Sequence, residues 1–308
     1  MRGARLGLLT VCMVIALVAC GSGAEEPGDG SPTDDSAAPA EAVEPPGDGP
    51  MVYGQVRTAD GRPVVGAEIS VVGVLDESAE YAGYTPVTDA QGRYQVSVQP
   101  GDFSVSGTYS TDYLGQHYTF GLAPETGTGD ESFPIRDTPS EHNFIWKISG
   151  RRPGTEGAGE LGNDFFGGQA HFYIADVRAF QMHETHFADE FGSGFEVKVE
   201  LTPEGPLIDG SAGTTYTSSH MVSMPNEAKW TDIDIPVGQY RVQVTVVKAD
   251  GSTKALDVIG VAPEEAGLAR RQQPPVYLTF EPKRADVGGL REMQVVLAYG
   301  PPYDPVNF

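Results

Sequence analysis

Short stretches in which apolar and polar residues alternate run along the chain from about residue 51. Four of the clearest are YQVSV, FEVKVEL, YRVQVTV and VYLTF, at residues 94–98, 195–201, 240–246 and 276–280. In each stretch every second side chain is apolar, which is typical of a β-strand with one face on a core. Turn sequences such as TADGRP, TDAQGRY and VKADGST separate the strands. The pattern predicts an all-β fold, in which only residues 176–191 (DVRAFQMHETHFADEF) favour a short helix.

The first half of this region carries a recognisable motif. It reads MVYGQVRTADGRPVVGAEISVVG over 51–73 and TDAQGRYQVSVQPGDFSVSG over 88–107. Asp60-Gly61 suits a hairpin turn, and Pro63 suits a strand edge that needs no ladder donor. Together these segments resemble the carboxypeptidase regulatory-like domain, a transthyretin-like β-sandwich. The resemblance covers about residues 51–148 and implies a non-catalytic module, because the zinc motif of the attached peptidases has no counterpart in the sequence.

The second half shows a similar succession of strands and turns, with a weaker match to the motif. Residues 149–164 are rich in Gly, Pro and charge, which is typical of a flexible linker. In the segment KWTDIDIPVGQYRVQVTVVKADG, a strand, a Pro-x-Gly turn and an aromatic-led strand follow one another as they do in the first half. We therefore expect two tandem β-sandwich domains, with the second over 165–308.

The first 20 residues follow a different pattern. Arg2 and Arg5 precede an apolar run from Leu6 to Ala19, which is shorter than the about 20 residues that a membrane span needs. This arrangement is typical of a secretory signal. Its last four residues, LVAC, resemble the lipobox of bacterial lipoproteins. In that family the signal is removed before the cysteine, which then carries diacylglycerol and often a further acyl chain such as palmitate. The resemblance implies a signal peptide over 1–19 and lipid attachment at Cys20.

Lipidation at Cys20 would place the protein on the outer face of the bacterial cytoplasmic membrane. Two or three acyl chains anchor a protein stably, whereas one chain alone binds marginally. The residue after the cysteine is Gly21 and not an acidic residue, and for a cell with two membranes this suggests retention in the inner one. Cys12 would leave with the signal, and the mature chain would then contain no disulfide. A plain signal peptide or an uncleaved anchor is the alternative.

Residues 20–50 are predicted to form a disordered acidic tether. Between residues 21 and 50 the chain has six Gly, six Pro and eight acidic residues, with no Lys, Arg or aromatic residue. Such a segment buries too little apolar surface to offset its ordering entropy. The whole chain has 20 basic and 43 acidic residues, a net charge of −23. This charge argues against nucleic acid as a partner and against adhesion to anionic lipid through a basic patch.

Few residues suggest chemistry. The sequence has no Gly-rich phosphate loop and no Gly-x-Ser-x-Gly motif, so we expect no catalytic residue and no cofactor. His183 and His186 would share one face of a helix and could hold zinc together with Asp189 or Glu190. On a strand the two histidines would point to opposite faces, and a solvated loop or short helix is the simpler interpretation.

Two groups are candidates for ligand binding. If Ile233 and Ile235 face the core, then Trp230, Asp232 and Asp234 share the other face, where the ring could stack on a sugar and the acids could bind hydroxyls or calcium. The alternative is a Trp packed under a loop beside solvated aspartates.

In TYSTDYLGQHYTFG, Tyr113 and Tyr118 could form an aromatic platform on a loop, or could simply belong to strands and core.

These observations favour a non-catalytic, lipid-anchored cell-surface protein that binds carbohydrate or a protein partner through its β-sandwich loops. One alternative is a metal-binding protein or metal-dependent enzyme that uses His183 and His186. Another is a structural spacer or assembly subunit of an envelope complex.

Overall fold

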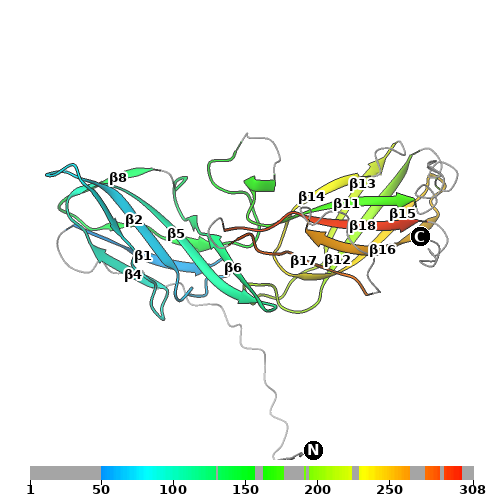
Figure 1. The fold of residues 1–308 in the computed structure, drawn as a ribbon, viewed down its shortest axis with the longest axis horizontal. Helices are drawn as coiled ribbons and strands as arrows, with labels where there is room; N and C mark the ends of the chain where they lie inside the picture. Colours follow the sequence, from blue (N-terminus) through cyan, green and yellow to red (C-terminus); the bar gives the residue numbers. More distant parts are fainter. Residues whose placement is uncertain are drawn as a thin grey trace, which may run out of the picture. The chain divides into compact units, whose positions relative to one another are not determined.

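The structure is a computed structural model of the whole chain (Figure 1). It describes residues 50–129, 131–156, 162–176, 191, 194–223, 229–263, 275–284 and 288–299. The predicted signal, Cys20, nearly all of the tether, and His183 and His186 lie outside these ranges. No helix in the described part of the chain is long and apolar enough to cross a membrane.

The first half forms two five-stranded sheets. One has the order β4-β1-β10-β7, with β9 also paired to β1, and comprises Arg93–Ser97, Met51–Thr58, Phe144–Trp146, Ala123–Pro124 and Ser140–Glu141. The other has the order β3-β2-β5-β6, with β8 also paired to β5, and comprises Tyr81–Tyr84, Glu68–Leu75, Gly101–Tyr113, Gln116–Gly121 and Ser132–Ile135. The turn at Pro100 connects β4 to β5, so it passes the chain from one sheet to the other instead of closing a hairpin.

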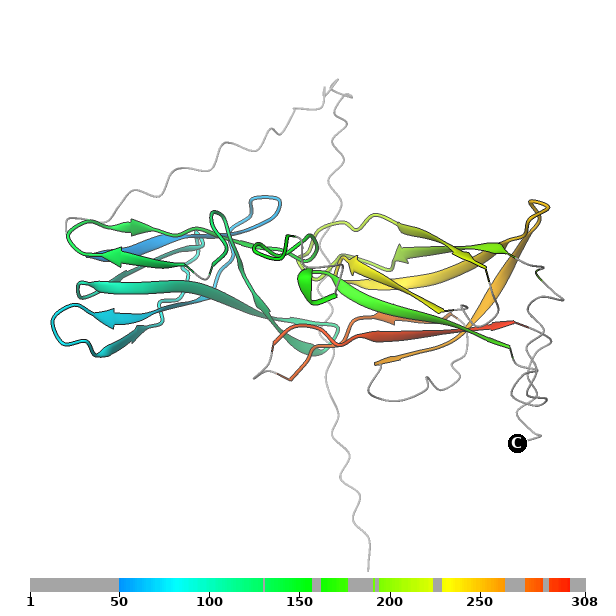
Figure 2. The same cartoon turned by 90° about the horizontal axis from the view of Figure 1, so that it is seen from above.

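The second half forms an eight-stranded sheet of order β13-β12-β15-β16-β18-β11-β14, with β17 also paired to β15. In the same order, these strands are Tyr216–Val222, Phe195–Pro203, Gln239–Val247, Thr253–Pro263, Met293–Tyr299, Gly168–Asp176, Lys229–Ile235 and, for β17, Tyr277–Thr279. β16 pairs with β15 through Leu256 and with β18 from Asp257 onward. β16 therefore joins the part of the sheet that contains β15 to the part that contains β18. The strands β11 and β18, far apart in sequence, lie side by side in parallel (Figure 1 and Figure 2).

Alternation along the strands builds the core. The inward residues of β2, β5, β12 and β15 are Val, Ile, Leu, Phe and Tyr, with Gly at three positions of β2 and β5, and most of the apolar side chains are fully buried. Gly54 on β1 is required by a close approach, because a Cβ there would lie 2.0 Å from the backbone oxygen of His142. The prediction of an all-β fold with β-sandwich domains is confirmed.

Hydrogen bonds join the described ends of the linker to the strands that follow. The Val237 amide donates to Ile148 O over 3.2 Å, and the Gly150 amide donates to Asp234 Oδ1 over 2.7 Å. The Tyr118 hydroxyl donates to Phe280 O over 2.7 Å. A 3-10 turn, η1, occupies Gly162–Asp164 just before β11. The flexible joint that the composition of the linker predicts stays a prediction; among its described residues, the amides of Gly150 and Arg152 donate hydrogen bonds to Asp234 and Asp164.

Candidate functional site

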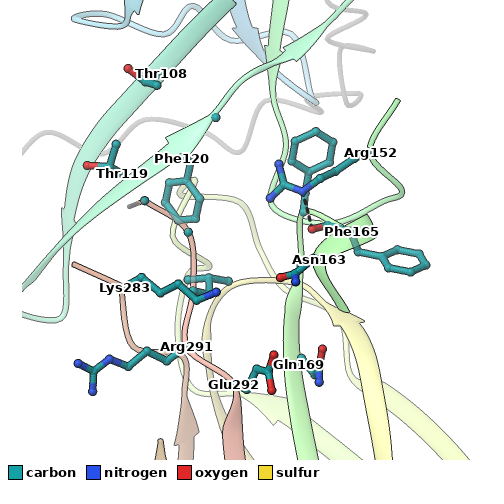
Figure 3. Close-up of a pocket in the computed structure, with 16 residues that line it drawn as sticks. Thr108, Thr119, Phe120, Arg152, Asn163, Phe165, Gln169, Lys283, Arg291 and Glu292 are labelled. Carbon is teal, nitrogen blue, oxygen red and sulfur yellow. Dashed lines mark hydrogen bonds between the residues drawn. The ribbon is translucent and has the colours of Figure 1, made fainter. Parts of the chain in front are cut away.

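A pocket of about 510 Å³ opens where β5 and β6 meet the segment before β11 and the loop before β18 (Figure 3). Three groups of residues supply its walls: the strand residues 108 and 119–121, the residues 152, 163, 165–167 and 169 before and at the start of β11, and the residues 283 and 288–292 before β18. The polar side chains among its lining residues are Thr108, Thr119, Arg152, Asn163, Gln169, Lys283, Arg291 and Glu292.

The lining is basic in a chain that is strongly acidic. Arg152, Lys283 and Arg291 contribute three positive charges, against one carboxylate from Glu292. The Lys283 side chain extends into the space, whereas the Arg291 guanidinium points away from it (Figure 3). Arg291 pairs with Glu281 over 3.6 Å, and Lys283 makes no ion pair with any described residue. The centre of the pocket is therefore faced by Arg152 and Lys283, which form no ion pair with a carboxylate in the part of the chain that the structure describes.

Arg152 is held in place by its neighbours. Its Nε donates to Phe165 O over 2.9 Å, and its guanidinium carbon lies 4.4 Å from the centroid of the Phe166 ring. Burial lowers the pKa of Arg152 from its ordinary value, although an arginine remains protonated at any physiological pH. A guanidinium fixed by one nitrogen and one ring contact keeps its other N–H groups for a ligand.

The loop that carries Lys283 is pinned at both ends. Gly288 and Gly289 have φ values of +64° and +83°, a region that glycine occupies without steric cost. The Lys283 amide donates to Gly289 O over 2.9 Å, and the Gly289 amide donates to Thr119 O on β6 over 3.0 Å. The turn thereby places the Lys283 side chain opposite the segment that carries Arg152.

The remaining wall combines amides with a carboxylate. His171 Nε2 lies 2.9 Å from the Gln169 amide nitrogen and 3.2 Å from Glu292 Oε2, and His171 Nδ1 lies 2.8 Å from Thr231 Oγ1. These contacts orient Gln169 and Glu292, which lie next to each other in the pocket (Figure 3). The arrangement offers hydrogen-bond donors and acceptors for hydroxyl groups, and positive charge for an acid.

Trp230, Asp232 and Asp234 do not share an open face. The pairing of β14 with β11 shifts register, because Gly168 pairs with Ile235 while Ala170 pairs with Asp232. β14 therefore contains one extra residue at this point, a β-bulge. Asp232 is only 3% exposed and points inward as Ile235 does, so the prediction that alternation carries through this strand is wrong.

The two aspartates are occupied by internal hydrogen bonds. Asp232 accepts from Ser218 Oγ and His220 Nε2, each over 2.6 Å, and burial raises its pKa. Asp234 Oδ1 accepts from the amides of Gly150 and Gly167 over 2.7 and 3.2 Å, and burial raises its pKa as well. Neither carboxylate presents its oxygens to a sugar or a calcium ion.

The ring of Trp230 is also engaged. It stacks on Phe172 at 5.2 Å and on His220 at 5.3 Å between ring centroids. Its Nε1 is buried and has no hydrogen-bond partner among the residues that the structure describes. Trp230 is thus part of the packing of β11, β13 and β14, so it lies neither on an open face nor, as the alternative interpretation has it, under a loop beside solvated aspartates.

Tyr113 and Tyr118 lie on β5 and β6 rather than on a loop. Tyr118 is completely buried, and burial raises the pKa of its hydroxyl to about 12. Tyr113 is half-buried and donates to Pro206 O over 3.0 Å. The two rings meet edge to face at 6.3 Å, so Tyr118 belongs to the core and cannot act as a stacking platform.

The zinc hypothesis falls on residues that the structure does not describe, since His183 and His186 lie within 177–190. Within the described ranges, no three His, Cys, Asp or Glu side chains lie close enough together to hold a metal ion. The residues that line the pocket were missed at the level of sequence. The available signal was two of the three basic doublets in this acidic chain, Arg151-Arg152 and Lys283-Arg284; the third, Arg270-Arg271, lies outside the described residues.

Comparisons with known proteins identify no family. No family model and no curated protein match the sequence. The chain is similar to a Streptococcal ancillary pilin, at 13% identity and a TM-score of 0.24, over 82% of this chain and 62% of the pilin. It is similar to a putative cell adhesion protein from Bacteroides ovatus, at 12% identity and a TM-score of 0.21, over 67% of this chain and 84% of that protein.

A third similar structure is a C-terminal fragment of the pilus adhesin SpaC from Lactobacillus rhamnosus GG, at 9% identity and a TM-score of 0.25, over 82% of this chain and 99% of the fragment. Likenesses of this strength carry no conclusion about what this chain does. The resemblance of residues 51–148 to the carboxypeptidase regulatory-like domain stays a prediction.

Proposed function

We propose that the chain is a non-catalytic, lipid-anchored cell-surface protein that binds a saccharide in the pocket between β6, β11 and the residues 283 and 288–292. The pocket carries the proposal, because it combines amides, a carboxylate and cations around a space of about 510 Å³. Saccharide hydroxyls both donate and accept hydrogen bonds, and these side chains supply both kinds of partner. The lipobox-like LVAC sequence supports attachment to the membrane through Cys20.

The composition of the lining supports binding rather than catalysis. Hydrolysis of a glycosidic bond commonly uses two carboxylates that flank the bond. Glu292 is the only carboxylate among the described lining residues, which include no His, Cys or Ser. The lining residues thus provide neither an acid–base pair nor an activated nucleophile.

The test is binding of saccharides to the chain from residue 21 to 308, which contains the whole compact unit 41–308. We would measure thermal shifts and then isothermal titration against neutral and acidic oligosaccharides from cell walls and plant material. A ligand that binds only the folded state raises the unfolding midpoint by mass action.

Two matched variants locate the site. Gln169→Ala removes an amide from the pocket, whereas Gln243→Ala removes an exposed amide from the far strand β15. We expect the first variant to weaken binding and the second to leave it unchanged. Equal affinities for both variants, or no saccharide bound by the wild type, would refute the assignment of this pocket.

A protein partner is a second candidate, favoured by one exposed apolar pair. Val74 on β2 and Tyr81 on β3 are cross-strand partners, and they are 43% and 77% exposed. β3 ends the order of its sheet, so its outer edge offers backbone groups to another strand. Pull-down with the wild type and with Tyr81→Ser tests this candidate, since a partner that binds both equally does not use this pair.

A further inference from the structure

We infer that the saccharide bound in this pocket is anionic, and that its acid group lies between Arg152 and Lys283. The inference rests on the proposed function and names the chemical class of its ligand. A pocket for a neutral sugar needs hydrogen-bonding groups only, and cations without counter-ions would raise the cost of enclosing it. The two positive side chains that face this pocket therefore require an explanation.

The charge of the chain makes their position informative. The protein has more than twice as many acidic as basic residues, 43 against 20, so a cation placed at random has a carboxylate as its commonest charged neighbour. Several cations do pair in this way, as Arg57 does with Glu125 over 2.9 Å and Arg62 with Asp60 over 2.8 Å. Arg152 and Lys283 line one cavity, and neither forms an ion pair with a described carboxylate.

The guanidinium of Arg152 is held in a fixed orientation, as an arginine that binds an acid group requires. A planar guanidinium binds a carboxylate or phosphate with two parallel N–H bonds, provided that its orientation is fixed. The bond from Nε to Phe165 O and the contact with the Phe166 ring fix that orientation. Lys283, held by the turn at Gly288 and Gly289, adds a point charge from the opposite side.

Glu292 limits how much negative charge the ligand carries. Its carboxylate lines the same pocket and would repel a second acid group, while it accepts readily from hydroxyls. Gln169 beside it and Asn163 on η1 offer amide donors and acceptors. The set fits a sugar residue with one acid group at the Arg152 end and hydroxyls at the Glu292 end.

The experiment compares sugars with and without a free acid group, by isothermal titration with the chain 21–308. One arm uses oligogalacturonate and its fully methyl-esterified form. The other arm uses glucose 6-phosphate and glucose, so that a carboxylate and a phosphate are distinguished. We expect an acidic probe to bind at least about tenfold more tightly than its neutral counterpart, and its affinity to fall as salt is added.

Lys283→Gln is the decisive variant, because the amide of Lys283 makes the turn and its side chain can be changed without loss of that bond. We expect it to weaken the acidic probe about tenfold or more and to weaken the neutral probe much less, because glutamine keeps a hydrogen-bond donor but not the charge. Lys229→Gln, on an exposed position of β14, is the matched control and should have no effect.

The outcomes separate this inference from the proposed function. Equal binding of the acidic and neutral probes, lost in Gln169→Ala, would overturn the acidic class and keep the saccharide pocket. Acidic probes that bind equally to wild type and Lys283→Gln would overturn the assigned position of the acid group. Failure of every probe and of the wider saccharide panel would overturn both.

Discussion

The carboxylate of Asp234 should contribute measurably to stability, because it holds two backbone amides of the segment before β11. The Gly150 and Gly167 amides donate to its Oδ1 over 2.7 and 3.2 Å. Asp234 also has a φ of +60°, in the left-handed region that Gly and Asn tolerate much better than Ala. Three substitutions separate these roles. Asp234→Asn keeps an acceptor and tolerates the angle, Asp234→Gly keeps only the angle, and Asp234→Ala keeps neither.

The expected magnitudes follow from the contacts. An unpaired buried donor costs about 1–3 kcal/mol, and here both amides are partly buried, so water recovers some of that loss. We expect Asp234→Gly to lower the free energy of unfolding by about 2–4 kcal/mol, including the extra chain entropy of glycine. Asp234→Ala should lose about 0.5–1 kcal/mol more, because the cost of the left-handed angle exceeds that entropy. Asp234→Asn should lose less than about 1 kcal/mol.

Urea unfolding followed by tryptophan fluorescence measures all three. The chain has two tryptophans, Trp146 on β10 and Trp230 on β14, so each half carries one reporter. We expect Asp234→Asn to be the most stable of the three variants, followed by Asp234→Gly and then Asp234→Ala. If Asp234→Gly matches the wild type, the carboxylate does not hold the two amides. If Asp234→Ala and Asp234→Gly are equally stable, the left-handed angle is not the constraint that we describe.

Three further predictions concern buried and terminal residues. Burial raises the pKa of Asp232 in the folded state, so its ionisation costs stability as the pH rises above about 4. Asp232→Asn should therefore gain stability on the wild type from pH 4 to pH 7, by about 1.4 kcal/mol for each tenfold difference between the acid dissociation constants of the unfolded and folded states; parallel pH profiles of the urea midpoint would contradict this. Tyr118→Phe leaves Phe280 O without its donor and should cost about 1–2 kcal/mol in the same assay, where an unchanged midpoint would mean that the bond contributes nothing. Cys20→Ala should move the protein from the membrane fraction to the soluble fraction, and a variant that still sediments with membranes would refute lipid attachment at this cysteine.

The fold class was predictable because strand periodicity is local. Stretches such as 195–201 and 240–246 alternate strictly, and they form β12 and β15 with the predicted residues inward. The periodicity failed where one residue was added to a strand. Nothing in TDIDI marks the bulge opposite Gly168 and Ala170, yet the bulge turns Asp232 inward and frees Asp234 to bind backbone amides. A single inserted residue thus reverses the face of every side chain before it.

The pocket could not be predicted in the same way, because its residues meet only in the folded chain. Arg152, Gln169 and Lys283 come from a linker, a strand and a loop, and no periodic pattern connects them. The sequence does show that basic residues are scarce and that two of them are adjacent at 151–152, 270–271 and 283–284. In an acidic chain such doublets mark candidate binding residues, and the doublets at 151–152 and 283–284 each place one member in the lining of the pocket.

The cluster of Ser218, His220 and Asp232 shows why residue types alone do not identify a catalytic site. A serine nucleophile requires a histidine that takes its proton, with the aspartate behind the histidine. Here the Ser218 hydroxyl donates to Asp232 Oδ2 over 2.6 Å, so its proton is directed to the carboxylate, and His220 Nε2 lies farther from the hydroxyl at 3.3 Å. The carboxylate is therefore the common acceptor, and the two neighbours offset part of the cost of burying it. A serine that donated to the histidine, with the aspartate behind the histidine, would suggest hydrolysis. With both residues bound to the carboxylate instead, the three side chains hold β13 against β14.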